Sequence, residues 1–194
     1  EAKQLLRINE IELKQLPVVF FEDGSLLTNP TIAEVGSKSG MNVQASKTMY
    51  DVTIIGAGPA GLAAAVYGGS EGLNSLLIEK RAPGGQAGTS SRIENYLGFP
   101  KGLSGSDLSR RAISQASRFG VEFLSPQEVK SITLKDNYKL IELVDGSEIN
   151  SKSVIITTGV DYKKHPAQAI DNFTGAGVYY GAATTEAQAC KDEE

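Results

Sequence analysis

Three glycines and one acidic residue carry the clearest chemical signal in this sequence. Gly56, Gly58 and Gly61 have the spacing GxGxxG and directly follow the apolar run Asp51–Ile55. In a turn of this kind the first glycine permits a tight bend, and the second lets the backbone approach an anion. The third lets the following helix pack closely on the strand. The pattern therefore predicts a site for the diphosphate of a dinucleotide.

The acidic residue lies where the ribose of such a dinucleotide would be held. Glu79 ends the run Leu73–Glu79 and lies roughly 20 residues into the unit. Its carboxylate is expected to accept hydrogen bonds from ribose hydroxyls, whereas a 2′-phosphate would meet like charge. The site is therefore predicted to prefer FAD or NAD to NADP. The predicted cofactor site also includes the adjoining Pro59, Ala60 and Lys80.

The elements that position these residues follow the order strand, turn, helix, strand. Asp51–Ile55 is apolar enough to be a buried parallel strand, and Leu73–Glu79 is a second strand. Between them, the alanine-rich run Leu62–Val66 predicts a helix in close contact with the sheet, whose N-terminal amides face the anion. The predicted fold is therefore α/β, a Rossmann-like parallel sheet with helices.

The second half of the chain is predicted to add one helix and a β-meander. Gly102–Gly120 predicts an amphipathic helix with Ser104 or Ser106 as its cap, followed by the short strand Val121–Leu124. In the residues that follow, apolar and polar side chains alternate along the chain, and turn-forming residues separate these alternating runs. This pattern is typical of half-buried antiparallel strands. The meander is expected to return into a buried strand, Ser153–Thr157.

Composition and charge narrow the class of protein. The hydrophobic fraction of 40% predicts an ordinary folded core, and the net charge of −4 argues against nucleic acid or an anionic membrane as a partner. No apolar run reaches membrane-spanning length, and the N-terminus lacks a signal peptide, so a cytoplasmic location is expected. With one cysteine, Cys190, and one histidine, His165, a structural zinc site is excluded on ligand count.

Several separate motifs, in the right order, resemble the thioredoxin reductase group of flavoprotein oxidoreductases. The resemblance runs from about Tyr50 to Tyr180 and covers most of the chain. It rests on GAGPAGLAAA as the FAD-binding fingerprint, Gly84-Gly85-Gln86 as the flavin loop, Ile93–Pro100 as the IENYPGFP motif and Ile155–Gly159 as the ATG strand.

The resemblance implies places for five further residues. Gly85, Gln86 and Asn95 are expected near the flavin or its ribityl chain, and Thr158 and Gly159 are expected where the chain runs past the cofactor. FAD is therefore the expected cofactor, and NADPH is expected only with a further domain that the family carries. No catalytic residue and no metal ligand is assigned.

Two departures from the family bear on chemistry. Where the family has a G-V-S-x-C-A-T-C redox motif, this chain has Gly177–Thr184, with Gly181 and Thr184 in the places of the cysteines. Neither residue can form a thiolate, so these positions cannot carry the family's thiol–disulfide step. The nicotinamide-binding domain and the later acidic FAD motif are also absent, and the sequence is expected to be a piece of a longer protein.

The first 40 residues predict a separate αββα segment. Helix periodicity over residues 1–15 precedes strand Val18–Phe21, a hairpin turn, strand Leu26–Leu27 and a second helix capped by Asn29 or Thr31.

This order, with Pro17 ahead of its first strand, resembles the second half of a thioredoxin or glutaredoxin fold, in which that proline is cis. A generic αββα piece is the other interpretation. The predicted boundaries are 1–40 for this partial thioredoxin-like segment, 41–49 for a linker and 50–194 for an incomplete FAD-binding domain.

The favoured hypothesis is the FAD-binding part of a thioredoxin reductase-like oxidoreductase that passes electrons from NAD(P)H through flavin, without the redox cysteine pair. The chain alone is not expected to turn over with NADPH. The alternative is a non-catalytic module that binds flavin or nucleotide or docks a partner. An NAD-binding Rossmann domain is a third interpretation, which the GGQ and ENYLGFP stretches disfavour. A thioredoxin-like protein or domain and a second copy of the chain are the protein partners considered.

Overall fold

The computed structural model describes residues 6, 8, 9, 11–161, 163–167, 169–174 and 176–180. Its elements, with 3-10 helices written η, are η1 (Leu13–Gln15), β1 (Val18–Phe20), β2 (Leu26–Thr28), α2 (Ile32–Lys38), β3 (Met49–Ile55), α3 (Pro59–Ser70), β4 (Ser75–Ile78), η2 (Gln86–Thr89), α4 (Gly105–Arg118), β5 (Glu122–Leu124), β6 (Val129–Leu134), β7 (Lys139–Leu143), β8 (Glu148–Ile156) and η3 (Ile170–Phe173). Within this part of the chain, no helix is long and apolar enough to cross a membrane.

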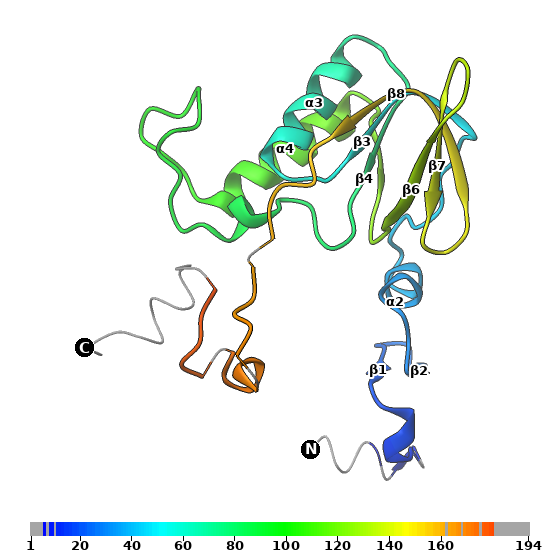
Figure 1. Ribbon diagram of the computed structural model, residues 1–194, viewed down its shortest axis with the longest axis vertical. Coiled ribbons are helices and arrows are strands. Elements are labelled where there is room, and N and C mark those ends of the chain that lie inside the picture. Colours follow the sequence, from blue (N-terminus) through cyan, green and yellow to red (C-terminus); the bar gives the residue numbers. More distant parts are fainter. Residues whose placement is uncertain are drawn as a thin grey trace.

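The main body is a six-stranded sheet in the order β5-β4-β3-β8-β7-β6 (Figure 1). Strands β5, β4, β3 and β8 pair in parallel, and the registers align Ile55 with both Ile78 and Ile156, and Ile78 with Leu124. The carboxyl ends of four strands therefore meet at one edge of the sheet. In open α/β sheets this is the edge outside which ligands bind.

Helices α3 and α4 lie together against one face of the sheet (Figure 1). Buried side chains of both layers form one apolar cluster, with Ile54 and Leu77 from the strands, Leu62 and Ala65 from α3 and Ala116 from α4. Burying a leucine or isoleucine fully contributes about 1.5–3 kcal/mol. This layer holds α3, and so the start of that helix, against β3.

The meander covers the other face of the parallel strands. Strands β6, β7 and β8 pair antiparallel, as predicted from the alternating pattern. Ile141, Leu143 and Ile149 of the meander pack against Leu76 and Ile78 of β4. These side chains are almost fully buried, so the meander is part of the core and not an appendage. The predicted Rossmann-like α/β fold with a meander is confirmed.

The predicted buried strand Ser153–Thr157 is wrong in burial and in extent. Strand β8 begins at Glu148 and ends at Ile156, and it is shared by two neighbours. Strand β7 pairs only with the first half of β8, from Glu148 to Ser151, while β3 pairs with β8 from Asn150 to Ile156. The second half of β8 therefore has one strand neighbour in the described chain, and Ile155 and Ile156 are 40% and 65% exposed.

The N-terminal segment follows the predicted order from residue 18 onward. Strands β1 and β2 form an antiparallel hairpin, and Thr31 caps α2 through a hydrogen bond from the Glu34 amide, 3.2 Å long. The Leu16–Pro17 peptide bond is cis, as the resemblance to thioredoxin suggested.

The single helix predicted over residues 1–15 is wrong in its second half. Residues 6 and 8 are helical, but Ile11 and Glu12 are not, and Leu13–Gln15 forms a 3-10 turn. Glu12 has an extended backbone and forms a capping box with Gln15, so a new turn starts there. The rest of the predicted helix, residues 1–5, 7 and 10, lies outside the described residues, as do Gly181, Thr184 and Cys190.

Candidate functional site

The glycine turn joins the end of β3 to the start of α3. Gly56 has φ = +101°, and a Cβ atom there would lie 2.4 Å from the Thr157 carbonyl oxygen. A Cβ at Gly61 would lie 1.9 Å from the Gly56 carbonyl oxygen. Both contacts are far shorter than van der Waals distance, so these two glycines are required by the fold itself. The predicted roles of a tight turn and close helix–strand packing are borne out at these positions.

Gly58 is different, because the fold does not require it. Its backbone is extended, with φ = −72° and ψ = −178°, and a Cβ atom there would meet nothing within 4 Å. Gly58 is the N-cap of α3 and provides no side-chain cap, and Pro59 has no amide hydrogen to satisfy. The open space beside Gly58 is thus next to the uncapped amides of a helix start, where an anion is favoured.

Glu79 leaves the end of β4 and reaches the same turn. One carboxylate oxygen, Oε2, accepts a hydrogen bond from the Ala57 amide at 2.8 Å, and Oε1 accepts one from the Arg81 amide at 2.9 Å. The Gly84 amide donates to the Ala57 carbonyl oxygen at 2.7 Å, which fastens the following loop to the turn. Two backbone donors therefore hold the carboxylate in one orientation, with lone pairs left for further donors.

A cavity of about 570 Å³ opens over the turn, a size typical of small-molecule sites. It is enclosed by the glycine turn, the end of β4, the loop that carries η2 and the segment after β8, and it is lined by Gly56, Gly58, Pro59, Ala60, Glu79, Lys80, Arg81, Ala82, Gly85, Gln86, Ala87, Thr89, Thr157, Thr158, Gly159, Val160 and Asp161.

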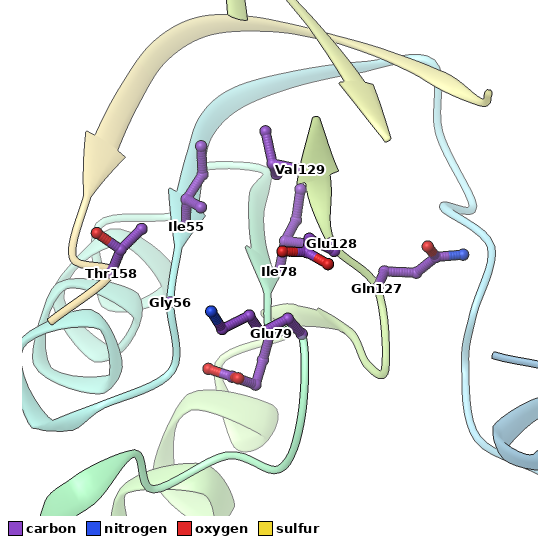
Figure 2. A pocket seen from close by; sticks show the side chains of 9 residues that line it. Ile55, Gly56, Ile78, Glu79, Gln127, Glu128, Val129 and Thr158 are labelled. Carbon is purple, nitrogen blue, oxygen red and sulfur yellow. The ribbon is translucent and has the colours of Figure 1, made fainter. Parts of the chain in front are cut away.

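A second cavity, of about 140 Å³, lies on the meander side of Glu79 (Figure 2). Its walls include Ile55, Ile78 and Val129, which come from β3, β4 and the start of β6. Gly56, Glu79, Lys80 and Thr158 line both cavities, so Glu79 stands at their junction. The pair of cavities can hold a long ligand whose middle passes the glycine turn and the carboxylate.

Charge around the larger cavity is mixed. Lys80 and Asp161 approach each other at 3.6 Å, joining the segment after β4 to the segment after β8. Arg81 adds a second cation to the lining. Across the residues that the structure describes, no group of three or more His, Cys, Asp or Glu side chains could hold a metal ion. The lining of the larger cavity therefore combines the start of α3, two cations and two carboxylates.

Comparison with known proteins agrees with this geometry. Residues 50–194 match the family profile of the pyridine nucleotide-disulphide oxidoreductases. The chain belongs to this family. Over 134 residues it is 38% identical to a thioredoxin reductase of Bacillus subtilis (strain 168), and this match covers 69% of the chain and 42% of that relative.

Solved structures of thioredoxin reductases also resemble the chain. A thioredoxin reductase from T. acidophilum matches 68% of this chain with a TM-score of 0.61 and 34% identity, and one from Streptococcus pyogenes MGAS5005 matches 66% with a TM-score of 0.58 and 35% identity. The matches cover 42% and 41% of those two structures. The chain is therefore a thioredoxin reductase-like domain of the flavoprotein oxidoreductases, and it spans less than half the length of these relatives.

The oxidoreductase fold brings most of the predicted site residues together. Ten of the twelve line the larger cavity: Gly56, Gly58, Pro59, Ala60, Glu79, Lys80, Gly85, Gln86, Thr158 and Gly159. Gly61 lies behind the turn, where its missing side chain permits packing. Asn95 is exposed and does not line either cavity, so its place near the flavin stays a prediction.

The sequence pattern missed the residues that follow β5. Gln127, Glu128 and Val129 line the smaller cavity because β5 ends beside β4 at the ligand edge of the sheet. The signal was available, since the loop after a parallel strand is where such sites are built. Thr157 was also missed as a site residue. Its hydroxyl donates to the Gly56 carbonyl oxygen at 2.8 Å and so fixes the turn from behind.

Proposed function

We propose that this chain is the FAD-binding part of a thioredoxin reductase-like oxidoreductase. The observation that carries the proposal is the meeting of Gly58, the start of α3 and the oriented Glu79 carboxylate in the lining of one cavity. A diphosphate fits beside Gly58, where amide hydrogens and the helix dipole favour negative charge. The adjoining carboxylate is then placed to accept hydrogen bonds from the adenosine ribose.

The two cavities suit the two halves of FAD. The smaller cavity beyond Glu79 has apolar walls from Ile55, Ile78 and Val129, which suit the faces and edges of the adenine ring. The larger cavity extends the other way, toward Gly85 and Gln86 on the loop that the family uses for its flavin. The family implies FAD binding, and the chain's own residues fit this group.

When bound, FAD would supply the redox chemistry, since its ring accepts a hydride from a reduced nicotinamide and passes electrons on. The residues of this chain would bind the cofactor, orient it and hold its diphosphate and ribose. Because Gly181 and Thr184 replace the family's two cysteines in sequence, we propose that electrons leave the flavin by a route other than a disulfide at these positions. A thioredoxin-like domain and a second copy are candidate partners.

The test is the colour of the purified protein. Bound flavin should give a yellow protein with absorbance bands in the visible, or the apoprotein should acquire them when mixed with FAD and passed through a desalting column. Bleaching of the bands by NADH or NADPH would favour an oxidoreductase over a non-catalytic flavin module. A protein that stays colourless after reconstitution would count against both.

A further inference from the structure

Gln127 connects the candidate cofactor site to the linker that precedes β3. It lines the smaller cavity, and only 6% of the residue is exposed. Its backbone amide donates to the Glu79 carbonyl oxygen at 2.9 Å. The residue therefore holds the backbone of the proposed ribose-binding acid from the meander side of the cavity.

The side chain of Gln127 faces the other way. Figure 2 shows its amide group directed away from the cavity, toward the chain that precedes β3. The Nε2 atom donates to the Val43 carbonyl oxygen at 2.8 Å and to the Asp145 Oδ2 atom at 2.6 Å. Both amide hydrogens are thus used, one by the linker and one by the turn between β7 and β8. An isosteric carboxylate at this position would meet two acceptors and no donor.

The linker itself is bound along β5 by a second set of hydrogen bonds. Ser46 donates to Glu122 twice, from its amide at 2.7 Å and from its hydroxyl at 2.6 Å, and the Tyr50 hydroxyl donates to the same carboxylate at 2.7 Å. Asn42 bonds to the backbone of Phe123 and Ser125 at 3.1 and 3.0 Å. Residues 42–46 therefore cover the free edge of β5.

Glu122 is at the centre of this contact. Burial raises the pKa of its carboxyl, but hydrogen bonds from Ser46, Tyr50 and Asn42 outweigh burial and hold the pKa below its ordinary value. The carboxylate is thus the form that binds the linker. The N-terminal segment, which precedes the linker in the sequence, also contacts this region. A Cβ atom at Gly36 of α2 would lie 2.5 Å from the ring of Pro126, the residue next to Gln127.

We propose that Gln127 is a positioning residue that couples docking of the linker to the shape of the adenine side of the cofactor site. The proposal rests on the proposed function. When residues 42–46 lie on β5, Val43 fixes the Gln127 amide, and the Gln127 backbone fixes Glu79. Because coupling between two binding equilibria is reciprocal, FAD binding should also favour the docked linker. The N-terminal segment would thereby influence cofactor affinity from outside the cavity.

The first test uses the linker as a reporter without cofactor. Trypsin can cleave after Lys47, which follows the docked residues and is exposed. The variant Gln127→Glu should speed this cleavage at least about fivefold, because coupling between two sites typically changes an equilibrium constant by that factor or more. Ser46→Ala should also speed it, while Ser37→Ala on the exposed surface of α2 is the matched control. Unchanged cleavage in Gln127→Glu would overturn the link between this residue and the linker.

The second test measures the dissociation constant for FAD in the same variants. Ser46 lines neither cavity, yet Ser46→Ala should weaken FAD binding several-fold, and FAD should slow cleavage after Lys47 in the unmodified chain. If the unmodified chain binds FAD and both variants bind it equally well, the coupling is wrong while the proposed function stands. If the unmodified chain does not bind FAD, both proposals fall. Should Gln127→Glu fail to fold, Ser46→Ala decides the question.

Discussion

At the scale of single residues, Glu79 is the side chain whose chemistry is most specific to the cofactor. Its two oxygens each accept one backbone hydrogen bond, from Ala57 and Arg81. A glutamine there would turn its NH2 group toward one of these amides, and it would lose the charge that strengthens hydrogen bonds to ribose hydroxyls.

Glu79→Gln should therefore weaken FAD binding about tenfold to a hundredfold, since a hydrogen bond to a charged group is worth about 1.5–3 kcal/mol. The measurement is a fluorescence titration with FAD. Glu71→Gln, an exposed change of the same chemistry at the end of α3, is the control and should bind as the unmodified chain does. Equal weakening in both variants would point to a general charge effect and against the assigned role.

Asp51 is one of the carboxyl groups that make stability depend on acid pH. Lys152 donates to its carboxylate at 2.7 Å and Asn74 donates from its backbone amide at 2.9 Å, which ties the start of β3 to β8 and β4. The Lys152 hydrogen bond is the main cause that lowers the pKa of Asp51 from 3.8 to about 2. Because the folded pKa is below the unfolded one, this stabilisation is present above about pH 4 and is lost as the pH falls toward 2.

The fall in melting temperature between pH 4 and pH 2 should thus be shallower in Asp51→Asn than in the unmodified chain. Thermal unfolding at several pH values, followed by circular dichroism, provides the comparison. Asp136→Asn, on an exposed turn of the meander, is the matched control. Parallel curves for Asp51→Asn and the unmodified chain would show that Asp51 contributes nothing to the acid transition.

At the scale of elements, the start of α4 matters because this helix packs on α3 and against the loop that carries η2. The sequence left Ser104 and Ser106 as alternative caps. In the structure the Ser104 hydroxyl accepts a hydrogen bond from the Asp107 amide at 3.1 Å, and Ser106 lies inside the helix.

Ser104→Ala should lower the free energy of unfolding by about 1 kcal/mol, the usual value of an N-cap hydrogen bond. Ser106→Ala should change it by less than about 0.5 kcal/mol, as is common at exposed sites. Urea denaturation of the two variants gives both values. A larger loss in Ser106→Ala than in Ser104→Ala would mean that the cap is misassigned.

The elements that the sequence predicted well are those with a local signal. The strand, turn and helix around Gly56 are set by residues next to one another, and the β1–β2 hairpin is set by its turn. The exposed end of β8 could not be predicted, because Ile155 and Ile156 have the same apolar pattern whether or not another element covers them. The side-chain contacts of Gln127 could not be predicted for a related reason, since its partners Val43 and Asp145 are far away in the sequence.

At the scale of the whole molecule, the chain combines a cavity over the glycine turn with the absence of a cysteine pair. It contains one cysteine, so it cannot form an internal dithiol–disulfide couple. The chain by itself should therefore show no NADPH-dependent reduction of a disulfide dye above a buffer control, even when saturated with FAD. NADPH-dependent reduction of the dye above the buffer control would contradict that expectation.

The glycine turn offers the most direct test of the central claim that the cavity over the turn holds FAD. Gly58 and Gly61 are three positions apart in the sequence, but only Gly61 is required for the packing of α3 against the glycine turn. Gly61→Ala should lower the free energy of unfolding by about 1–3 kcal/mol, as overpacking does. Gly58→Ala places its methyl group in the open space of the cavity, so the melting temperature should change by less than about 3 °C.

The decisive measurement is the dissociation constant for FAD of Gly58→Ala beside that of the unmodified chain, with thermal unfolding of both as the check on folding. The account predicts a folded variant with at least about tenfold weaker binding, because the methyl group would occupy the place of the diphosphate. A folded Gly58→Ala variant that binds FAD as tightly as the unmodified chain would contradict it.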